Sequence, residues 1–396
     1  MSIFSDNPIV KIYIKIQMNG SLTFIIFVAL AIFVYSLLNY YFIRKHKNTI
    51  SLSALSVIIV RLLLITIILT PIATIYFSWH GASVMTTLTS FTLYSWLAFL
   101  FLFLFIHGSV DIVLFGLGRF GFRPPAMTAK LIFLTTLGVS IFILFYGWYD
   151  ARNIRVERIS ISTSKLPADV ERMTFGLISD VHFSPIIGER MATEISRIIK
   201  KENVDILLCT GDLLDRGIAE PENIISILKS INPPLGKFAI TGNHEFIAGI
   251  DDSVKFIEKS GFNLLRDEAY SIKGVLNIVG VDDPSLERFE GQSLKPEKWA
   301  FRGLNPELFT LLLKHQPWVE KENLDLFDLQ ISGHTHAGQI FPFTALVKLV
   351  FPYICGLYDL GNHTQLYVSR GTGTWGPPFR FLAPPEITII ELKGIH

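Results

Sequence analysis

Side chains that can bind metal ions recur in five short segments, and each segment follows an apolar run. The segments are Asp180-Val181-His182, Gly211-Asp212-Leu213-Leu214-Asp215, Gly242-Asn243-His244-Glu245, Lys314-His315-Gln316 and Gly333-His334-Thr335-His336. They supply oxygen and nitrogen ligands without a thiolate, which suits divalent Mn, Fe, Co or Zn. The candidate ligands are Asp180, His182, Asp212, Asn243, His315, His334 and His336. This set exceeds the needs of one tetrahedral ion and favours two ions about 3.5–4 Å apart that share one carboxylate and a water.

A pair of ions of this kind activates a water as a nucleophile and holds the oxygens of a phosphoryl group during in-line attack. The leaving oxygen then needs a proton or a stabilising cation. His244 is next to a candidate ligand in the sequence and could supply the proton, with Asp215 orienting its ring. The pattern therefore predicts metal-assisted hydrolysis of a phosphoester or phosphoanhydride.

Each segment taken alone also has a structural explanation. Asp and Asn after a strand often cap the next helix. Asp215 could be an ordinary turn residue, and His315, close to Pro317, could be a loop histidine with satisfied hydrogen bonds. Five such segments, each placed where an apolar run ends, favour a shared site over five separate explanations. The remaining histidines lack such neighbours and are interpreted as structural: His46, His80, His107, His363 and His396.

After Asp150, strand-like runs alternate with helical patterns. The predicted order is strand 173–179, helix 189–201, strand 204–210, helix 222–231, strand 237–241 and helix 252–260. This alternation is typical of helices packed on a sheet, and ligands bind such sheets beyond the carboxyl ends of the strands. The candidate ligands follow the strands at such ends.

The chain before Asp150 has a different composition. Half of the whole sequence is hydrophobic and only 17% is charged, whereas a soluble domain has about 25% charged residues. The apolar surplus lies in four stretches, 21–43, 52–77, 87–107 and 131–149. About 20 such residues cross a bilayer as a helix, and the helices of a soluble domain would show a polar face. We therefore expect a multi-span membrane domain over 1–150 and a second domain over 151–396.

Lysine and arginine in the short loops predict the orientation of the spans, because such loops are cytoplasmic when they are basic. The first loop is basic and so is the third, but the second, 79–85, has neither residue. The basic residues are Arg44, Lys45 and Lys47 in the first loop and Arg119, Arg123 and Lys130 at the third. Four spans then place the second domain outside the cytoplasm. Basic residues before the first span and after the fourth oppose this orientation.

A net charge of +1 gives no basis for a nucleic-acid partner. The expected partners are a phosphorylated substrate and the bilayer of the cytoplasmic membrane. Cys209 and Cys355 lie far apart in the sequence and imply no disulfide framework.

The order D-x-H, G-D-x-x-D, G-N-H-E, a lone H and G-H-T-H resembles the calcineurin-like metallophosphoesterase superfamily, over roughly residues 155–396. The resemblance implies a sandwich of two sheets with helices outside, in four layers, α-β-β-α. It implies that one metal ion is held by Asp180, His182, Asp212 and His336. It implies that the second ion is held by Asp212, Asn243, His315 and His334, so that Asp212 bridges the two. His244 resembles the general acid or phosphate-contacting imidazole of the family, with Asp215 as its partner.

Two further features bear on the substrate. Arg370 and Arg380 lie in Gly- and Pro-rich loops, where a guanidinium could hold a phosphate in bidentate fashion; the alternative is a structural arginine. The segment 340–358 is unusually apolar and follows the last metal-binding motif. It is either packed in the domain or forms a lip that contacts the bilayer and admits a lipid-linked phosphate.

The sequence thus favours a membrane-anchored, dimetal phosphohydrolase. One alternative is a membrane scaffold or receptor whose phosphoesterase domain binds a ligand without hydrolysing it. A second is a transporter or channel with the domain as its regulator, but a single arginine within the spans, Arg61, gives little support for a transport pathway.

Overall fold

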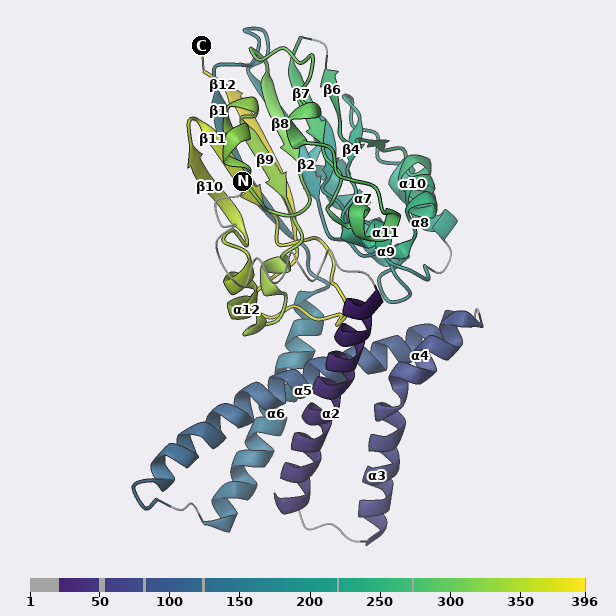
Figure 1. Cartoon of the computed structure of the whole chain (residues 1–396), viewed down its shortest axis with the longest axis vertical. Coiled ribbons are helices and arrows are strands. Elements are labelled where there is room, and N and C mark those ends of the chain that lie inside the picture. The colour runs from purple at the N-terminus through teal and green to yellow at the C-terminus, as the bar shows by residue number, and fades with distance from the viewer. Residues whose placement is uncertain are drawn as a thin grey trace. The chain divides into compact units, whose positions relative to one another are not determined.

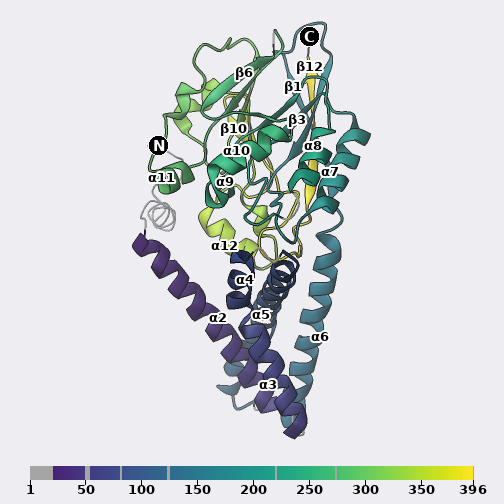
Figure 2. The same cartoon turned by 90° about the vertical axis from the view of Figure 1, so that its right-hand side faces the viewer.

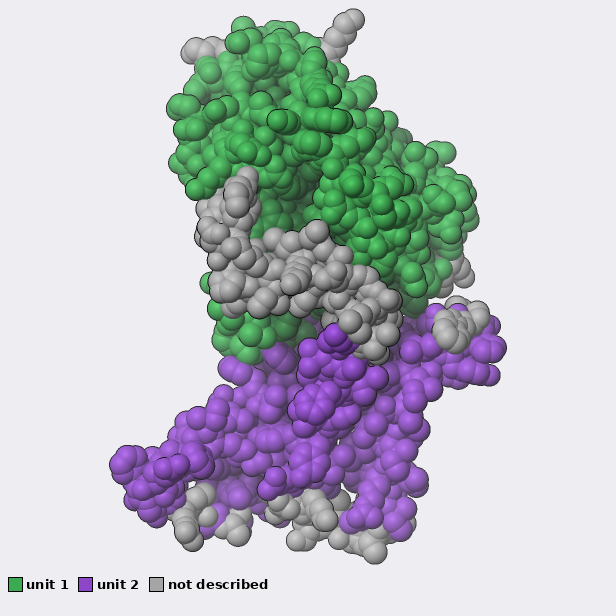
Figure 3. All heavy atoms as spheres, viewed as in Figure 1, with its two compact units in different colours: residues 1–20, 151–375, 382–396 green, residues 21–150, 376–381 purple. Residues whose placement is uncertain are grey.

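A computed structural model describes residues 21–49, 54–80, 83–122, 125–218, 221–272 and 274–395 (Figure 1). These residues form two compact units (Figure 3). One unit contains the segment Ala151–Trp375 and the chain from Leu382 onward, and the other contains Ser21–Asp150 together with the short segment Gly376–Phe381.

Two six-stranded sheets form the first unit, in the orders β1-β12-β2-β3-β4-β5 and β10-β11-β9-β8-β7-β6. The strands of the first sheet are β1 Arg155–Thr163, β2 Arg172–Ile178, β3 Ile206–Cys209, β4 Lys237–Ala239, β5 Asn263–Leu264 and β12 Glu386–Gly394. Those of the second are β6 Glu268–Ile272, β7 Leu276–Gly280, β8 Phe309–Leu313, β9 Leu329–Ser332, β10 Gly356–Gly361 and β11 Thr364–Val368. Strands β2, β3 and β4 are parallel neighbours, and so are β7, β8 and β9.

The core of the unit lies between the two sheets. Alternate residues of β3 point to opposite faces, as in any strand: Ile206 and Leu208 pack against residues of the second sheet, whereas Leu207 and Cys209 pack toward the helices. Strand β8 is buried along its whole length and is apolar except for Thr310, which is typical of a parallel strand covered on both faces.

Helices cover the outer face of the first sheet. Figure 2 shows two of them, α7 and α8, against this sheet. The helices of the unit are α7 Glu189–Glu202, α8 Pro221–Lys229, α9 Asn243–Ala248, α10 Ile250–Lys259, α11 Ser285–Glu290 and α12 Phe343–Val350. The outer face of the second sheet packs against Ala300 and Phe301, which follow the short 3-10 helix η1, Glu297–Trp299. The predicted sandwich is therefore confirmed, and its fourth layer is made largely of short helical turns.

The second unit is helical, with α2 Ser21–Thr49, α3 Ala54–Ile68, α4 Thr70–Trp79, α5 Ser83–Gly118 and α6 Ala126–Asp150. Within the described residues, Val84–Gly118 and Met127–Asp150 are long and apolar enough to cross a membrane. The pair Val57–Ile68 and Thr70–Ser78, bent by 43°, would make a third crossing if it forms one span. Two or three of the four predicted spans are thus supported. The first predicted stretch, 21–43, lies in helix α2, which is not among the crossings found within the described residues.

Aromatic side chains hold α2, α5 and α6 together. Phe42 makes edge contacts with Phe99 and Phe103, at ring-centroid distances of 5.3 and 5.1 Å, and Phe133 packs on the same cluster. Polar groups also join α2 to α5, because Asp111 accepts hydrogen bonds from the Tyr41 hydroxyl at 2.7 Å and from Lys45 Nζ at 2.6 Å. Pairing of this kind is the rule for charged residues within membrane helices.

The sandwich contains one buried ammonium group that predicts a pH dependence of stability. Lys237 is 5% exposed, and its Nζ donates to the carbonyl oxygens of Leu228 and Ser260 at 2.9 and 2.7 Å. Burial, and then the positive charge of Lys229, lower the pKa of Lys237 to about 8. Between about pH 8 and about 10.4 the unfolded chain holds a proton that the folded chain has released, so this group makes the free energy of unfolding rise with pH.

We therefore expect the free energy of unfolding of the wild type to rise relative to that of Lys237→Met across this range. Urea titrations of both proteins in detergent, at about pH 7.5 and about pH 9.5, measure the difference. The same difference at both pH values would show that the ammonium does not titrate as stated.

Candidate metal centre

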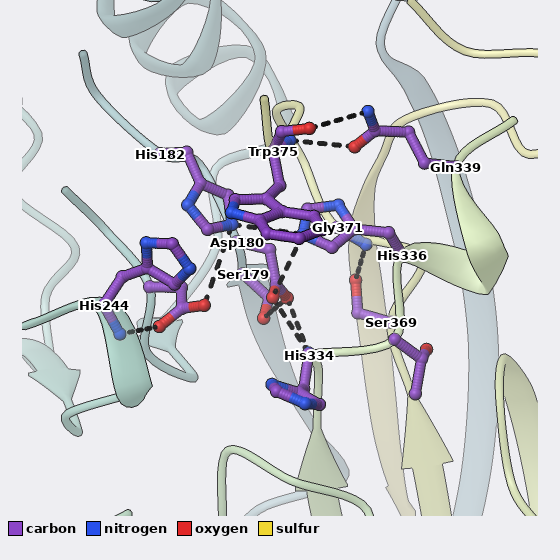
Figure 4. Close-up of polar contacts among 12 residues, drawn as sticks. Ser179, Asp180, His182, His244, His334, His336, Gln339, Ser369, Gly371 and Trp375 are labelled. Carbon is purple, nitrogen blue, oxygen red and sulfur yellow. Dashed lines mark hydrogen bonds and ion pairs between the residues drawn. The ribbon is translucent and has the colours of Figure 1, made fainter. Parts of the chain in front are cut away.

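The five motif segments meet at the carboxyl ends of strands from both sheets. Asp180 follows β2, Asp212 follows β3 and Asn243 follows β4, all in the first sheet. His315 follows β8, and His334 with His336 follows β9, in the second sheet. Parallel strands place their carboxyl ends at one edge of a sheet, and the two edges face the same space (Figure 4). Residues 154 positions apart in the sequence are thereby joined, as in the hydrogen bond from His334 N–H to Asp180.

The ligand atoms form three overlapping groups. Within each group the atoms lie within 4.8 Å of one another and could hold one metal ion. The groups are Asp180, His182 and His336; His182, Asp212 and His244; and Asp212, His315 and His334. Asn243 adjoins the third group, because its Oδ1 lies 3.2 Å from His315 Nε2 and 3.0 Å from His334 Nδ1.

Asp212 belongs to the second and third groups and also lies close to His182 of the first. Its Oδ2 is 3.7 Å from His182 Nε2 and 3.3 Å from His315 Nε2, and its carboxylate is almost fully buried. The donor set fits cations, because ring nitrogens face each other closely: His182 Nε2 lies 3.1 Å from His336 Nε2, and His334 Nδ1 lies 3.1 Å from His315 Nε2. A cation between such nitrogens would use the lone pairs of both rings.

The backbone at the ligands adopts a conformation that side chains rarely tolerate. The φ angles are positive at Asp180, His182, Asp212, His334 and His336, with values of 51°, 54°, 51°, 70° and 48°. Each such residue costs about 1–3 kcal/mol, and strain of this kind gathers where the surroundings hold a functional site in place. Helix capping does not account for the presence of Asp and Asn at these positions. Asp180 and Asp212 precede no helix directly, and Asn243 forms no side-chain cap at α9.

Glycines next to the ligands allow the segments to approach. A Cβ on Gly333 would overlap the Ser179 hydroxyl and the Asp180 carboxylate, and a Cβ on Gly242 would overlap the Asp212 carboxylate. The motif glycines are thus required by close contact between segments, which is the role expected of glycine where backbones meet.

Residues behind the ligands fix their orientation. His315 Nδ1 lies 2.8 Å from the carbonyl oxygen of Thr210 and donates to it, which leaves Nε2 available for a metal ion. The carboxylate of Glu245 accepts hydrogen bonds from the N–H groups of Asp212, Leu213 and Gly242 at 3.0, 2.7 and 2.7 Å. Glu245 therefore ties the loop after β3 to the loop after β4, a role that the motif alone did not predict.

His244 and Asp215 form a pair beside the ligands. His244 Nδ1 lies 2.5 Å from Asp215 Oδ1, and His182 Nδ1 lies 3.2 Å from the same oxygen. Burial opposes the positive charge of His244, but the carboxylates of Asp212 and Asp215 outweigh it and raise the pKa of His244 to about 9. Burial would raise the pKa of Asp215, but the His182 and His244 imidazoles hold it well below its usual range.

Burial governs the charges of the other groups. It raises the pKa of Asp180, with Asp212 adding to the effect and the imidazoles of His315 and His182 opposing it. Burial and the positive charge of His315 lower the pKa of His334 to about 3, so its ring is neutral and can bind a metal ion. Burial, together with the negative charge of Asp212, raises the pKa of Glu245 to about 7.

The two arginines predicted to bind substrate have other contacts in the structure. Arg370 pairs with Glu157 and Glu386 at 2.5 and 2.6 Å, and its Nε donates to the carbonyl oxygen of Pro384. Arg380 is fully buried and belongs to the helical unit, where its N–H donates to the Gly147 carbonyl oxygen at 2.9 Å. The ion pairs of Arg370 fit the structural alternative, and substrate binding by either arginine stays a prediction.

The apolar segment 340–358 divides into a packed part and an exposed part. Phe351 is buried, with its ring 5.2 Å from His334 and 5.0 Å from Trp318. Leu346 and Leu349 on α12 are 52% and 54% exposed. Phe341 and Leu357, outside α12, are each 40% exposed as well, so the lip stays a prediction, and Phe351 is part of the wall of the metal centre.

Comparison with known proteins agrees with this geometry. Residues 173–338 match the family model of the calcineurin-like phosphoesterases. A metallophosphoesterase of Aquifex aeolicus is 36% identical over 258 residues, which cover 65% of this chain and 98% of the relative. A transmembrane protein with metallophosphoesterase domain from Danio rerio is 30% identical over 322 residues, covering 78% of this chain and 74% of the relative.

The chain therefore belongs to the calcineurin-like metallophosphoesterase family. It is a metal-dependent phosphoesterase. The apolar helices and the names of two vertebrate relatives, from Danio rerio and Bos taurus, indicate a membrane protein.

Gly333→Ala tests the close approach of β9 to β2. The added methyl group would push against Ser179 and Asp180, so we expect the affinity for Mn²⁺ to fall at least about tenfold, as it does when groups that orient ligands are lost. Calorimetric titration of the metal-free protein measures this change. The control is Gly188→Ala, where the added atom meets nothing within 4 Å. Equal affinities of the wild type and Gly333→Ala would contradict the packing described.

Proposed function

We propose that the protein hydrolyses a phosphoester or phosphoanhydride with two divalent metal ions. One ion would be held by Asp180, His182, Asp212 and His336, and the other by Asp212, Asn243, His315 and His334. The observation that carries the proposal is the position of Asp212, which belongs to two of the three groups of ligand atoms. A carboxylate in that position can be shared by two ions, and the fit of the donor set does not distinguish Mn, Fe, Zn and Co.

When bound, the two ions lower the pKa of a water molecule and neutralise the charge of the phosphoryl oxygens. The residues of the chain contribute the proton transfer. Asp215 accepts the Nδ1–H of His244 at 2.5 Å and fixes the ring, so Nε2 of His244 can carry a proton to the leaving oxygen. Deep burial shields Asp180 and Asp212 from bulk solvent, which strengthens each charge interaction there.

Two variants and one control test this assignment. Asp212→Asn removes the shared negative charge, and we expect both the bound metal and the Mn²⁺-dependent hydrolysis of nitrophenyl phosphates to be lost. His244→Ala is expected to lower kcat by about 10²–10⁴-fold with the metal content unchanged. His363→Ala, on the exposed β10–β11 turn, should match the wild type.

The outcomes separate the candidate functions. Full activity of Asp212→Asn would rule out the dimetal mechanism. Loss of one metal ion in His244→Ala would show that His244 is a metal ligand, which is possible because it belongs to one of the three groups of ligand atoms. A wild type that binds metal and phosphate analogues but hydrolyses no phosphoester would be a scaffold or receptor.

We also propose that four spans anchor the protein and that the hydrolytic domain lies outside the cytoplasm. The basic residues of the first and third loops support this orientation. A lipid-linked substrate is a further proposal, for which the exposed apolar residues of α12 are the support.

Cysteine labelling tests the orientation. Lys298 is an exposed residue of η1 in the sandwich, and we expect Lys298→Cys to react with a membrane-impermeant maleimide in intact cells. The wild type is the control, because Cys209 is buried and Cys355 is partly buried. Labelling that requires lysis would place the domain in the cytoplasm.

A further inference from the structure

The indole of Trp375 lies beside the His244 imidazole with much of its surface exposed. The two ring centroids are 6.1 Å apart with an edge-on angle of 75°, and Trp375 is 52% exposed. Figure 4 shows the indole extending from its backbone toward the labelled residues of the metal centre. A large aromatic side chain gains free energy by covering its apolar surface, and here that surface is left open next to the group proposed to protonate the leaving oxygen.

The backbone of Trp375 is held by the metal-binding turn after β9. The Gln339 side chain donates to the Trp375 carbonyl oxygen at 2.9 Å and accepts from its N–H at 2.8 Å. Gln339 is 8% exposed and has a φ of 54°, in the region that favours glycine. Its strained backbone, three positions after His336, is stabilised by surroundings that include this pair of hydrogen bonds.

The residues just before Trp375 are held by the turn after β2. Thr372 N–H donates to the Ser179 carbonyl oxygen at 2.7 Å, and Gly373 N–H donates to the Asp180 carbonyl oxygen at 3.0 Å. A Cβ on Gly373 would overlap the Val181 backbone. The segment that carries the indole is therefore fixed to two metal-binding turns, one from each sheet, and the indole is preorganised relative to the ligands.

We propose that Trp375 determines substrate specificity by packing against an apolar group esterified to the phosphate. The inference rests on the proposed function, in which the ions hold the phosphoryl oxygens and His244 faces the leaving oxygen. A leaving group next to His244 then lies next to the indole. The indole offers a flat apolar face and no charge, so it favours alkyl or aromatic alcohols over small polar ones.

Steady-state kinetics of the full-length protein with Mn²⁺ tests the inference. The substrates are octyl phosphate, naphthyl phosphate and methyl phosphate. For Trp375→Ala we expect kcat/KM to fall about tenfold with an apolar ester, mainly through KM, and less than about twofold with methyl phosphate. Trp375→Phe should restore most of the loss. If kcat/KM falls only with octyl phosphate, the partner of the indole is an alkyl group. If it falls only with naphthyl phosphate, the partner is a planar ring.

Trp299→Ala is the matched control, because Trp299 is 43% exposed and lies on η1, in a different element of the sandwich. Trp299→Ala should leave kcat/KM unchanged for all three substrates. If Trp375→Ala changes kcat/KM equally for all three substrates, or for none of them, the inference is overturned.

Binding of octylphosphonate and methylphosphonate, which are not hydrolysed, separates this inference from the proposed function. We expect Trp375→Ala to bind octylphosphonate about tenfold more weakly than the wild type and to bind methylphosphonate equally well. If the wild type hydrolyses no ester but binds octylphosphonate more tightly than Trp375→Ala does, the proposed function fails and the apolar contact is supported. If hydrolysis occurs but both phosphonates bind the two proteins equally, the apolar contact fails alone.

Discussion

Two buried carboxylates and several imidazoles share a space from which water is largely excluded, and this crowding of charge is the constraint on which the site depends. Asp180 and Asp212 are 0% and 2% exposed, and the negative charge of Asp212 disfavours the ionised form of Asp180. Burying an unpaired charge is costly unless a cation or a hydrogen-bond network compensates for it. The backbone N–H groups of His334 and His244, which donate to these carboxylates, provide part of the compensation, and bound divalent ions would provide the rest.

The same constraint explains the local backbone. Short side chains must reach one small space from strands of two different sheets, so the chain turns sharply at the end of each strand. The positive φ angles at Asp180, Asp212 and His334 are the result. The hydrogen bonds of Glu245 and the close contacts at Gly242 and Gly333 hold these turns in place. The sandwich thus stabilises strain at its edge by packing a large apolar core behind it.

The regular parts of the sandwich follow from local sequence patterns. The predicted helix 189–201 agrees with α7, and the predicted strand 204–210 contains β3. The metal motifs could be recognised because each stands where an apolar run stops. Strand β12 could not be placed from such patterns, because it inserts between β1 and β2 from the far end of the chain. Its position depends on pairing between residues more than 200 positions apart, such as Arg155 with Glu386.

Other features of the site depend on contacts that no local sequence pattern reveals. An arginine in a Gly- and Pro-rich loop has the same local sequence whether it holds a phosphate or a carboxylate, and Arg370 lies beside Glu157 only because β1 pairs with β12. The hydrogen bonds between Gln339 and Trp375 join residues 36 positions apart, and no local pattern announces them. The four-span prediction rested on composition, and the described helices support two of the spans, or three if α3 and α4 form one bent span.

Electron paramagnetic resonance of the protein loaded with Mn²⁺ tests the central claim most directly. Two ions that share the Asp212 carboxylate at about 3.5–4 Å would be magnetically coupled. The account predicts a coupled multiline spectrum at two ions per chain, which disappears in Asp212→Asn. A six-line spectrum of isolated Mn²⁺ in the wild type at two bound ions per chain would contradict it.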